Sequence, residues 1–316
     1  MILVSVVVIT YNSTKTIIET LESIKAQSYQ NIELIVSDDC SNDNTVDLVC
    51  EWLELNGSRF VNTEIVTTGK NTGVAGNINR GVAKSHGEWI KSIAGDDLLI
   101  PTAIEEYLGF VKNNKEPVNM CVSDVQCFSS EGNVDHEIVE AYDYYFKCEQ
   151  EPYEQQWKRV CKELVFVGPT FFYSRELFNQ IGGFSEEYGN CEEWPFVFKI
   201  LKSGTPIYAI KKKIVKYRVS STSLCHSNKK NELGNKKLFD SICRFFFDGP
   251  FKELLRQNRY LLAWHYLIMY KTKMYRFLSG DSKMSLFCYK YFVYLSPYLY
   301  LHKIRCVIGS TTKRVK

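Results

Sequence analysis

Two pairs of neighbouring aspartates are the residues of this chain best suited to metal or phosphate chemistry. Asp38–Asp39 and Asp96–Asp97 each follow a segment that we predict to be a strand. Clustered carboxylates repel one another, and a hard divalent cation relieves that repulsion; Mg²⁺ is commonly held by one or two carboxylates together with phosphate oxygens. The aspartates therefore fit a nucleoside diphosphate with its cation. The alternative is a pair of turns, because SDDCSND and AGDDLLIP both contain turn-favouring residues.

A pair of glutamates, Glu192 and Glu193, precedes the helix that we predict over Trp194–Ser203. Acidic side chains at this place complement the helix dipole, an effect of about 0.3–1 kcal/mol. The functional alternative is a general base, which must lie within hydrogen-bond reach of the proton that it removes.

Alternating strand and helix patterns must position these acids. The expected strands are Val4–Thr10, Ile32–Ser37, Thr63–Thr67, Trp89–Ile93, Asn119–Cys127 and Val165–Tyr173. The expected helices are Lys15–Gln27, Asn42–Leu55, one ending near Ser85–Gly87, Ser174–Gln180 and Trp194–Ser203. Strands alternating with helices imply right-handed crossovers and a largely parallel sheet. Because such sheets bind ligands beyond the carboxyl ends of their strands, we expect Thr10–Asn12 and the two aspartate pairs along one edge.

Five segments together resemble the successive signatures of the family 2 glycosyltransferases. They are VSVVVITYN, IELIVSDDCSNDNT, NTGVAGNINRG, HGEWIKSIAGDDLLIP and IGGFSEEYGNCEEWPFVFKI. Each is weak alone, but their order and spacing match the family over about residues 3–220. The resemblance implies the GT-A fold, an α/β, Rossmann-like arrangement with a mostly parallel sheet flanked by helices. We expect this domain over residues 1–225, followed by a helical, basic and aromatic extension over residues 226–316.

The resemblance implies a donor site for a UDP-sugar. Thr10 and Asn12 match residues that line the nucleotide pocket, and Asp39 matches the carboxylate that accepts a hydrogen bond from the uracil ring. Asp96 and Asp97 match the end of the DxD-type motif, which contacts the ribose and a Mn²⁺ or Mg²⁺ ion on the diphosphate. Which of these two aspartates holds the metal stays open.

The resemblance also implies a catalytic base. Glu193 matches the acidic residue that would deprotonate the acceptor hydroxyl, which then attacks the anomeric carbon as the nucleoside diphosphate leaves. One such displacement inverts the configuration of the sugar.

The chain departs from the family pattern at three places. Ala94 stands where the family often has the first aspartate of DxD. The family usually has Asp at the position of Glu193, and the longer side chain leaves Glu192 as an alternative base. Ser220 stands where the family usually has a histidine, for which His226 is a candidate replacement or a structural residue.

Composition and charge place the protein in the cell. The chain has 316 residues, 45% of them hydrophobic, and its 11 cysteines include no CxxC pair, which favours reduced thiols in the cytosol. The apolar start MILVSVVVIT has no basic flank and no small-residue cleavage site, so we expect a strand and no secretory signal. Residues 1–210 hold 16 Lys/Arg and 31 Asp/Glu, whereas residues 211–316 hold 23 and 5. This asymmetry predicts a basic surface for an anionic partner.

The basic part ends in an apolar, tyrosine-rich segment. Ser285–Leu301 is short for a membrane span, contains Lys290 and Pro297, and is rich in residues that favour the membrane interface. We expect peripheral helices on the inner face of the cell membrane, with Lys and Arg reaching anionic lipid. The alternative is a packed helical subdomain with a solvated basic face. No nucleic-acid partner is expected, because no recognisable nucleic-acid-binding motif accompanies the charge.

The leading hypothesis is therefore an inverting hexosyltransferase. It would move a hexose or N-acetylhexosamine from a UDP-sugar to a polyprenyl-diphosphate-linked saccharide during O-antigen, lipopolysaccharide or capsule synthesis. One alternative is a catalytically inactive protein that binds a nucleotide-sugar or a glycan, for which Ala94 is the only sign. A Rossmann oxidoreductase is a second alternative, but TYNSTKT stands where GxGxxG would follow the first strand.

Overall fold

A computed structural model describes residues 1–129, 137–138, 151–163, 166–219 and 232–279, with the single positions 284, 287, 291, 296 and 297. The chain divides into two compact units, Met1–Ser241 and Ile242–Lys316. The predicted boundary at residue 225 lies outside the described residues, as do Ser220, His226 and most of Ser285–Leu301.

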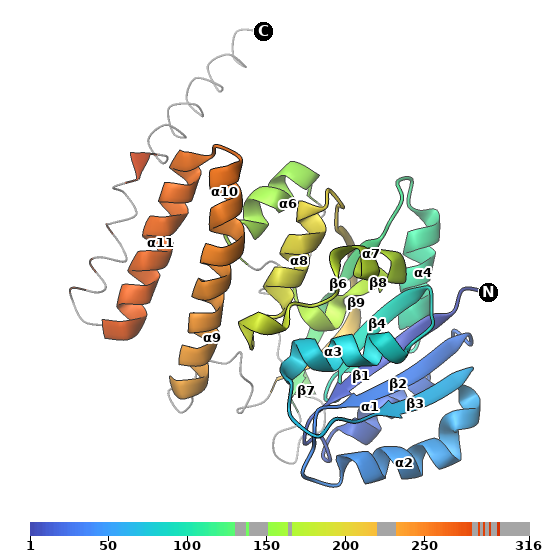
Figure 1. The fold of residues 1–316 in the computed structure, drawn as a ribbon. Helices are drawn as coiled ribbons and strands as arrows, with labels where there is room; N and C mark the ends of the chain where they lie inside the picture. The colour runs from blue at the N-terminus through green and yellow to red at the C-terminus, as the bar shows by residue number, and fades with distance from the viewer. Residues whose placement is uncertain are drawn as a thin grey trace. The chain divides into compact units, whose positions relative to one another are not determined.

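The first unit is built on one mixed sheet in the order β3-β2-β1-β4-β8-β6-β9-β5, with β7 paired to β6. The strands are β1 (Val4–Thr10), β2 (Ile32–Asp38), β3 (Asn62–Val66), β4 (Trp89–Ala94), β5 (Leu98–Leu99), β6 (Met120–Ser129), β7 (Glu137–Ile138), β8 (Phe172–Ser174) and β9 (Tyr208–Arg218). Strands β1 to β4 pair in parallel, whereas β8 is antiparallel to both β4 and β6. This confirms the predicted α/β fold with a largely parallel sheet (Figure 1).

Helices cover both faces of the sheet. They are α1 (Ile17–Lys25), α2 (Thr45–Asn56), α3 (Gly73–Lys84), α4 (Ala103–Asn113), α6 (Tyr153–Val160), α7 (Arg175–Ile181) and α8 (Glu193–Lys202), with short 3₁₀ turns η1 (Gly57–Arg59), η3 (Gly168–Thr170) and η4 (Glu186–Tyr188). Val6 of β1 lies in a buried cluster with Leu21 of α1 and Tyr107 of α4. The next residue, Val7, faces Gly81 of α3 so closely that a Cβ there would overlap it. Since successive strand side chains point to opposite faces, α1 and α4 cover one face and α3 covers the other.

The parallel register brings the polar segments to one edge, as predicted. Thr10 at the end of β1 lies beside Asp38 at the end of β2, and Ile9 lies beside Ala94 at the end of β4. The residues that follow these strands therefore gather at the carboxyl ends, where open α/β sheets bind ligands.

The predicted strand Val165–Tyr173 is wrong over most of its length. Val165 lies outside the described residues, the segment Gly168–Thr170 forms η3, and only Phe172–Ser174 pairs as β8. Pro169 has no N–H to give to a strand ladder and its ring fixes φ, so the apolar pattern is overridden by a turn.

The long strand β9 was not predicted. It carries Lys211–Lys213 and Lys216, which belong to the basic residues 211–316 of the charge count, and pairs in parallel with β6. These lysines therefore belong to the sheet of the first unit. Lysines interrupt the apolar pattern of this strand, which is why periodicity alone did not show it.

The second unit is helical. Its elements are the last turn of α9 (Glu232–Phe246), a π-helical segment η6 (Phe247–Phe251), α10 (Lys252–Arg256) and α11 (Tyr260–Ser279). Phe246 and Tyr270 stack with ring centroids 3.9 Å apart, and Leu254 and Ala263 are fully buried. This confirms the expected helical C-terminal part. Within the described residues, no helix combines the length and apolarity needed to cross a bilayer.

Candidate active site

The first polar cluster joins the ends of β1 and β2. Thr10 donates its hydroxyl to Asp38 Oδ1 at 2.8 Å, and both side chains are buried. The Asp38 carboxylate also accepts from the Ser41 hydroxyl at 2.5 Å and from the Ser41 amide at 2.8 Å. Both carboxylate oxygens of Asp38 therefore accept hydrogen bonds that close the turn after β2. Thr10 is held beside Asp38 at the end of β1.

Asp39 caps the N-terminus of α3. Its carboxylate accepts from the amides of Thr72 and Gly73 at 2.9 and 2.8 Å and from the Thr72 hydroxyl at 2.6 Å. Arg80 Nη2 adds a charged bond at 3.0 Å. Burial acts to raise the pKa of Asp39, but these donors outweigh burial and hold the pKa below its usual value. The carboxylate is therefore ionised and fixed in place.

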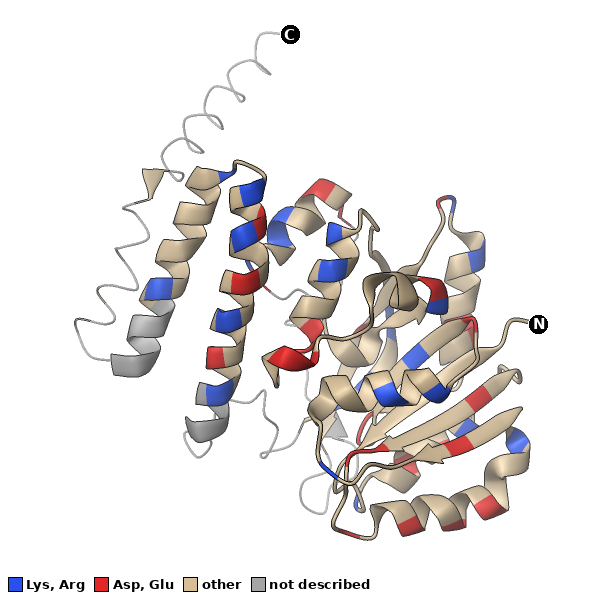
Figure 2. Cartoon of the chain, in the orientation of Figure 1, with Lys and Arg blue, Asp and Glu red and all other residues tan. Residues whose placement is uncertain are grey.

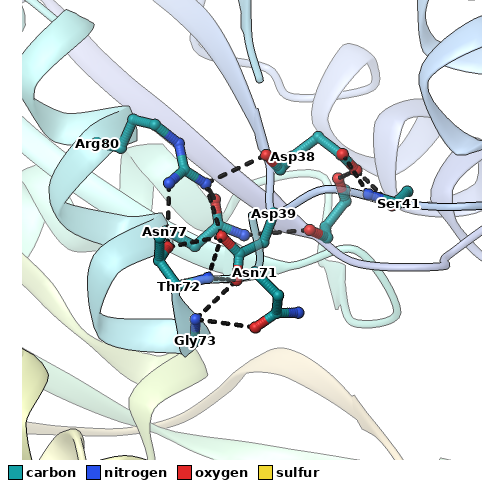
Figure 3. A network of polar contacts seen from close by, with 9 residues as sticks. Asp38, Asp39, Ser41, Asn71, Thr72, Gly73, Asn77 and Arg80 are labelled. Carbon is teal, nitrogen blue, oxygen red and sulfur yellow. Dashed lines mark hydrogen bonds and ion pairs between the residues drawn. The ribbon is translucent and has the colours of Figure 1, made fainter. Parts of the chain in front are cut away.

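Arg80 of α3 connects the residues of this cluster through hydrogen bonds (Figure 3). Besides Asp39, it donates to the Asp38 carbonyl at 3.2 Å, Asn77 Oδ1 at 2.8 Å and the Thr72 hydroxyl at 3.1 Å. Sequence reasoning missed Arg80, although it lies within the NTGVAGNINRG segment. Its partners come from the end of β2, two loops and α3, so its role shows only in three dimensions.

Asn12 links the loops that follow β1 and β2. Its φ of 52° is in the left-handed region, which Asn tolerates better than most residues. The Asn12 amide donates to Ser41 Oγ and the Asn12 side-chain oxygen accepts from the Asn42 amide, both at 2.8 Å. Asn12 itself is exposed, so it lies at the rim of the edge that Thr10 and Asp39 line from within.

The structure separates Asp96 from Asp97. Asp97 is only 2% exposed and its Oδ1 accepts from the Arg218 amide of β9 at 2.9 Å. Asp96 is exposed, and no other described residue donates a hydrogen bond to its carboxylate. Arg218 Nε instead donates to the Asp96 backbone carbonyl at 2.7 Å, which fixes the turn. Asp96 thus presents a free carboxylate, whereas Asp97 anchors the turn to β9.

Electrostatics at this turn agree with that separation. Burial and the neighbouring Asp96 raise the pKa of Asp97 well above its ordinary value, against the opposing effects of Lys91 and Arg218. Desolvation by nearby protein atoms raises the pKa of Asp96 more modestly, and Arg218 lowers it. A carboxylate that is partly desolvated and reachable from solvent is suited to a cation, because the cation favours its charged form.

Lys91 is the charged residue most deeply buried near the turn. It is 0% exposed, and burial lowers its pKa to about 7 although Asp97 acts in the opposite direction. Its ammonium donates to the carbonyls of Ser92, Pro169 and Phe171. It therefore connects β4, which leads to the aspartates, with η3.

Glu192 and Glu193 lie at the start of α8, as predicted. Glu193 Oε1 accepts from the Gly168 amide at 2.5 Å. Burial, then Glu192, raise the pKa of Glu193 to about 8, against the Gly168 bond. Burial also raises the pKa of Glu192, whose Oε2 is buried without a partner among the described residues. Such perturbed carboxyl groups are typical of functional sites.

No group of three or more His, Cys, Asp or Glu side chains that could hold a metal occurs in the described part of the chain. The four aspartates at the sheet edge therefore do not form one metal cluster, because Asp38 and Asp39 are committed to loop and helix bonds. A divalent cation here would rest on Asp96 and on oxygens of a bound phosphate group. That donor set fits the chemistry of Mg²⁺ and Mn²⁺.

A family model described as glycosyl transferase family 2 matches residues 5–182. The chain belongs to this family. Its sheet and helices match solved GT-A structures, among them S. aureus TarS 1–349 in complex with UDP-GlcNAc. That likeness has a TM-score of 0.62 at 17% identity and covers 91% of this chain and 78% of TarS 1–349.

Relatives of this family 2 member are themselves glycosyltransferases. An uncharacterised glycosyltransferase of Haemophilus influenzae is 26% identical over 201 residues, covering 63% of this chain. The chain spans 62% of that relative's length, less than two thirds. The Escherichia coli protein WfgD, a UDP-Glc:α-D-GlcNAc-diphosphoundecaprenol β-1,3-glucosyltransferase, is 26% identical over 262 residues, covering 82% of this chain and 92% of WfgD.

Proposed function

We propose that this family 2 protein is an inverting glycosyltransferase that moves a hexose or N-acetylhexosamine from a UDP-sugar to a hydroxyl of a lipid-linked saccharide. The observation that carries the proposal is the exposed Asp96 carboxylate. It has no bond from another described side chain and lies at the carboxyl edge of the sheet, where the turn beneath it is fixed by Asp97 and Arg218. A carboxylate without a bond from another described side chain, on a turn fixed by hydrogen bonds, is suited to bind the divalent cation of a diphosphate.

The nucleotide would lie along the ends of β1 and β2. Thr10, Asn12 and Asp39 meet there, and the ionised Asp39, which already accepts from Thr72, Gly73 and Arg80, would accept from a nucleobase N–H in place of its Arg80 bond. The UDP-GlcNAc complex of TarS supports UDP as the nucleotide.

A Mn²⁺ or Mg²⁺ ion, held by Asp96 and the diphosphate, would neutralise charge on the leaving group when bound. Asp97 would act indirectly, since its contact with β9 sets the position of Asp96. The proposal therefore gives the two aspartates different roles, a choice that the sequence left open.

Glu193 would serve as the general base. It takes the proton of the acceptor hydroxyl, whose oxygen forms a bond to the anomeric carbon while the bond to the nucleoside diphosphate breaks. The Gly168 amide holds Oε1, which leaves Oε2 to face the acceptor. Glu192 is the alternative base, because its buried Oε2 has no described partner.

The proposed acceptor and membrane surface are supported by a relative and by the charge of the C-terminal residues. WfgD acts on a diphosphoundecaprenol-linked sugar, which supports a polyprenyl-diphosphate acceptor in O-antigen or capsule synthesis. Residues 242–316 hold 14 Lys/Arg and 3 Asp/Glu. Tyr260, Leu261 and Trp264 are 58%, 45% and 53% exposed at the start of α11, in a stretch without charged residues (Figure 2). Exposed apolar side chains within a basic part of the chain suit a cytoplasmic protein bound to the anionic inner face of the membrane.

The test compares Glu193→Gln with Glu192→Gln. UDP and UDP-sugar affinity is measured by calorimetry with and without Mn²⁺, and transfer is measured from UDP-Glc and UDP-GlcNAc to a synthetic GlcNAc-diphosphate-lipid. Glu193→Gln should bind the donor normally and lose transfer about 10²- to 10⁴-fold, the usual contribution of a general base. Full activity in Glu193→Gln with loss in Glu192→Gln moves the base by one residue. Donor binding by the unaltered protein without any turnover supports the inactive binding protein instead.

A further inference from the structure

Two buried side chains, Lys91 and Tyr107, donate hydrogen bonds to the backbone carbonyls of the turn η3. The Lys91 ammonium donates to the carbonyl of Pro169, and it lies 3.4 Å from that of Phe171. The carbonyl between them, of Thr170, accepts from the Tyr107 hydroxyl at 2.9 Å. Three successive carbonyls of the turn are thus bound by donors from β4 and α4, and both donor side chains are fully buried.

The same turn is bonded to Glu193 on its other side. Gly168 immediately precedes Pro169, and its amide donates to Glu193 Oε1 at 2.5 Å. A Cβ added at Gly168 would overlap the Glu193 carboxylate, so the backbone approaches Glu193 as closely as a glycine allows. The position of this amide therefore depends on what holds the carbonyls behind it.

We propose that Lys91, assisted by Tyr107, is a positioning residue that fixes the Gly168 amide and through it the carboxylate of Glu193. This inference rests on the proposed function, in which Glu193 is the base. An ammonium buried inside a sheet is unfavourable unless its hydrogen bonds are satisfied. The carbonyls of Ser92, Pro169 and Phe171 satisfy those of Lys91, so its burial depends on keeping η3 in this conformation.

The surroundings of Glu193 give this inference a measurable consequence. Glu192 and burial raise the pKa of Glu193, and the Gly168 hydrogen bond lowers it. The adjacent Cys191 thiol has a pKa raised by burial to about 12 and stays neutral at working pH. The turn itself, Gly-Pro-Thr-Phe, contributes no titratable side chain, but Lys91, which donates to its carbonyls, has a pKa that burial lowers to about 7. Loosening the turn should therefore move the Glu193 titration to higher pH.

The experiment follows the Gly168 amide resonance by ¹H–¹⁵N NMR between pH 5 and pH 10 in the protein without substrate. In the unaltered protein the amide shift should show an inflection near pH 8 from Glu193, and Glu193→Gln should remove that inflection and leave only the one that Lys91 causes near pH 7. Lys91→Met should move the inflection upward or reduce its amplitude. Tyr107→Phe should act in the same direction but less, because Lys91 remains. Lys199→Met is the matched control, since Lys199 is a half-buried lysine that donates to the Gly183 carbonyl away from the turn.

Kinetics then separate the inference from the function on which it rests. Lys91→Met should lower kcat roughly tenfold with little change in the KM for the donor, as expected when base geometry alone is disturbed. A Glu193 inflection near pH 8 that has the same position and amplitude in Lys91→Met as in the unaltered protein overturns the inference. If Lys91→Met does not fold, Tyr107→Phe decides in the same way. Full transfer activity in Glu193→Gln, together with a shifted titration in Lys91→Met, instead overturns the base assignment and leaves the positioning role intact.

Discussion

The Gly168 amide and Glu193 Oε1 are joined by a hydrogen bond of 2.5 Å that leaves no room for a side chain at residue 168. Gly168→Ala should therefore displace the Glu193 carboxylate and lower kcat by about 10- to 100-fold, a part of what a general base supplies. The measurement is steady-state transfer, with donor affinity as the check on folding.

Gly109→Ala is the matched control for that substitution. Gly109 lies inside α4 with no atom close enough to meet a new Cβ. Its replacement should leave activity unchanged and stabilise the protein by about 0.5–1 kcal/mol, because alanine restricts the unfolded chain and favours the helix. Equal activity losses in both variants would contradict a special role for Gly168.

The raised pKa of Glu193 predicts how activity depends on pH. A base acts only in its ionised form, and burial and Glu192 raise the pKa of this carboxyl to about 8. The kcat/KM of transfer should rise with pH and level off above an inflection near 8 in the free enzyme. An activity that is flat between pH 6 and pH 9 would count against Glu193 as the base.

The raised pKa of Glu193 also predicts that the stability of the folded protein falls as pH rises, whereas activity increases. Its pKa is higher in the folded chain than the ordinary 4.5, so the folded state binds the proton more tightly. This contribution to stability is fully present below pH 4.5 and is lost as pH rises through about 8. Glu193→Gln, which stays neutral, should therefore gain stability relative to the unaltered protein between pH 6 and pH 9 in urea unfolding. Parallel unfolding curves at both pH values would contradict this.

The two aspartates of the turn after β4 should respond differently to substitution. Asp96→Ala should abolish Mn²⁺-dependent UDP binding and change the free energy of unfolding by less than about 0.5 kcal/mol, since its side chain is exposed. Asp97→Ala should lower the free energy of unfolding by about 1–3 kcal/mol, because the Arg218 amide loses its buried acceptor.

Asp97→Asn provides the control, since its side-chain oxygen still accepts from Arg218. It should keep the stability that Asp97→Ala loses. Calorimetry and urea unfolding on all three variants distinguish the two roles, and loss of metal-dependent binding in Asp97→Asn alone would reverse them.

Membrane association should depend on the exposed start of α11. Replacing Tyr260, Leu261 and Trp264 together with serine removes the apolar side chains and keeps the charge, so co-sedimentation with phosphatidylglycerol vesicles should fall while transfer to a soluble acceptor analogue persists. Leu55→Ser, at an 83% exposed position of α2, is the control and should not alter sedimentation. Unchanged vesicle binding of the triple variant would place the membrane contact elsewhere.

The parallel half of the sheet could be predicted from the sequence because each of its strands and helices is indicated by a pattern of neighbouring residues. β1, β2 and β4 are rich in Val and Ile and are followed closely by polar residues, and α1 shows its buried residues Ile17, Leu21 and Ile24 at helical spacing. These signals require no knowledge of distant contacts. The edge that gathers the polar residues followed from the parallel topology alone.

The antiparallel half and the division of roles at the turn could not be predicted in this way. β9 is interrupted by lysines, and η3 replaced a predicted strand because Pro169 ends the ladder. Asp97 differs from Asp96 because it meets Arg218, more than a hundred residues later in the chain. Nothing near Asp97 in the sequence indicates that contact.

The capping of α3 by Asp39 has a consequence for the kinetics of nucleotide binding. The amides of Thr72 and Gly73 and the Arg80 guanidinium bind Asp39 and so close the loop before α3 through contacts within the chain. The conformational entropy of this loop is therefore lost when the protein folds and not when the nucleotide binds. Nucleotide binding should then be fast and change the backbone little. Slow hydrogen exchange at Thr72 and Gly73 in the free protein, barely altered by UDP, would be the signature of this closed state.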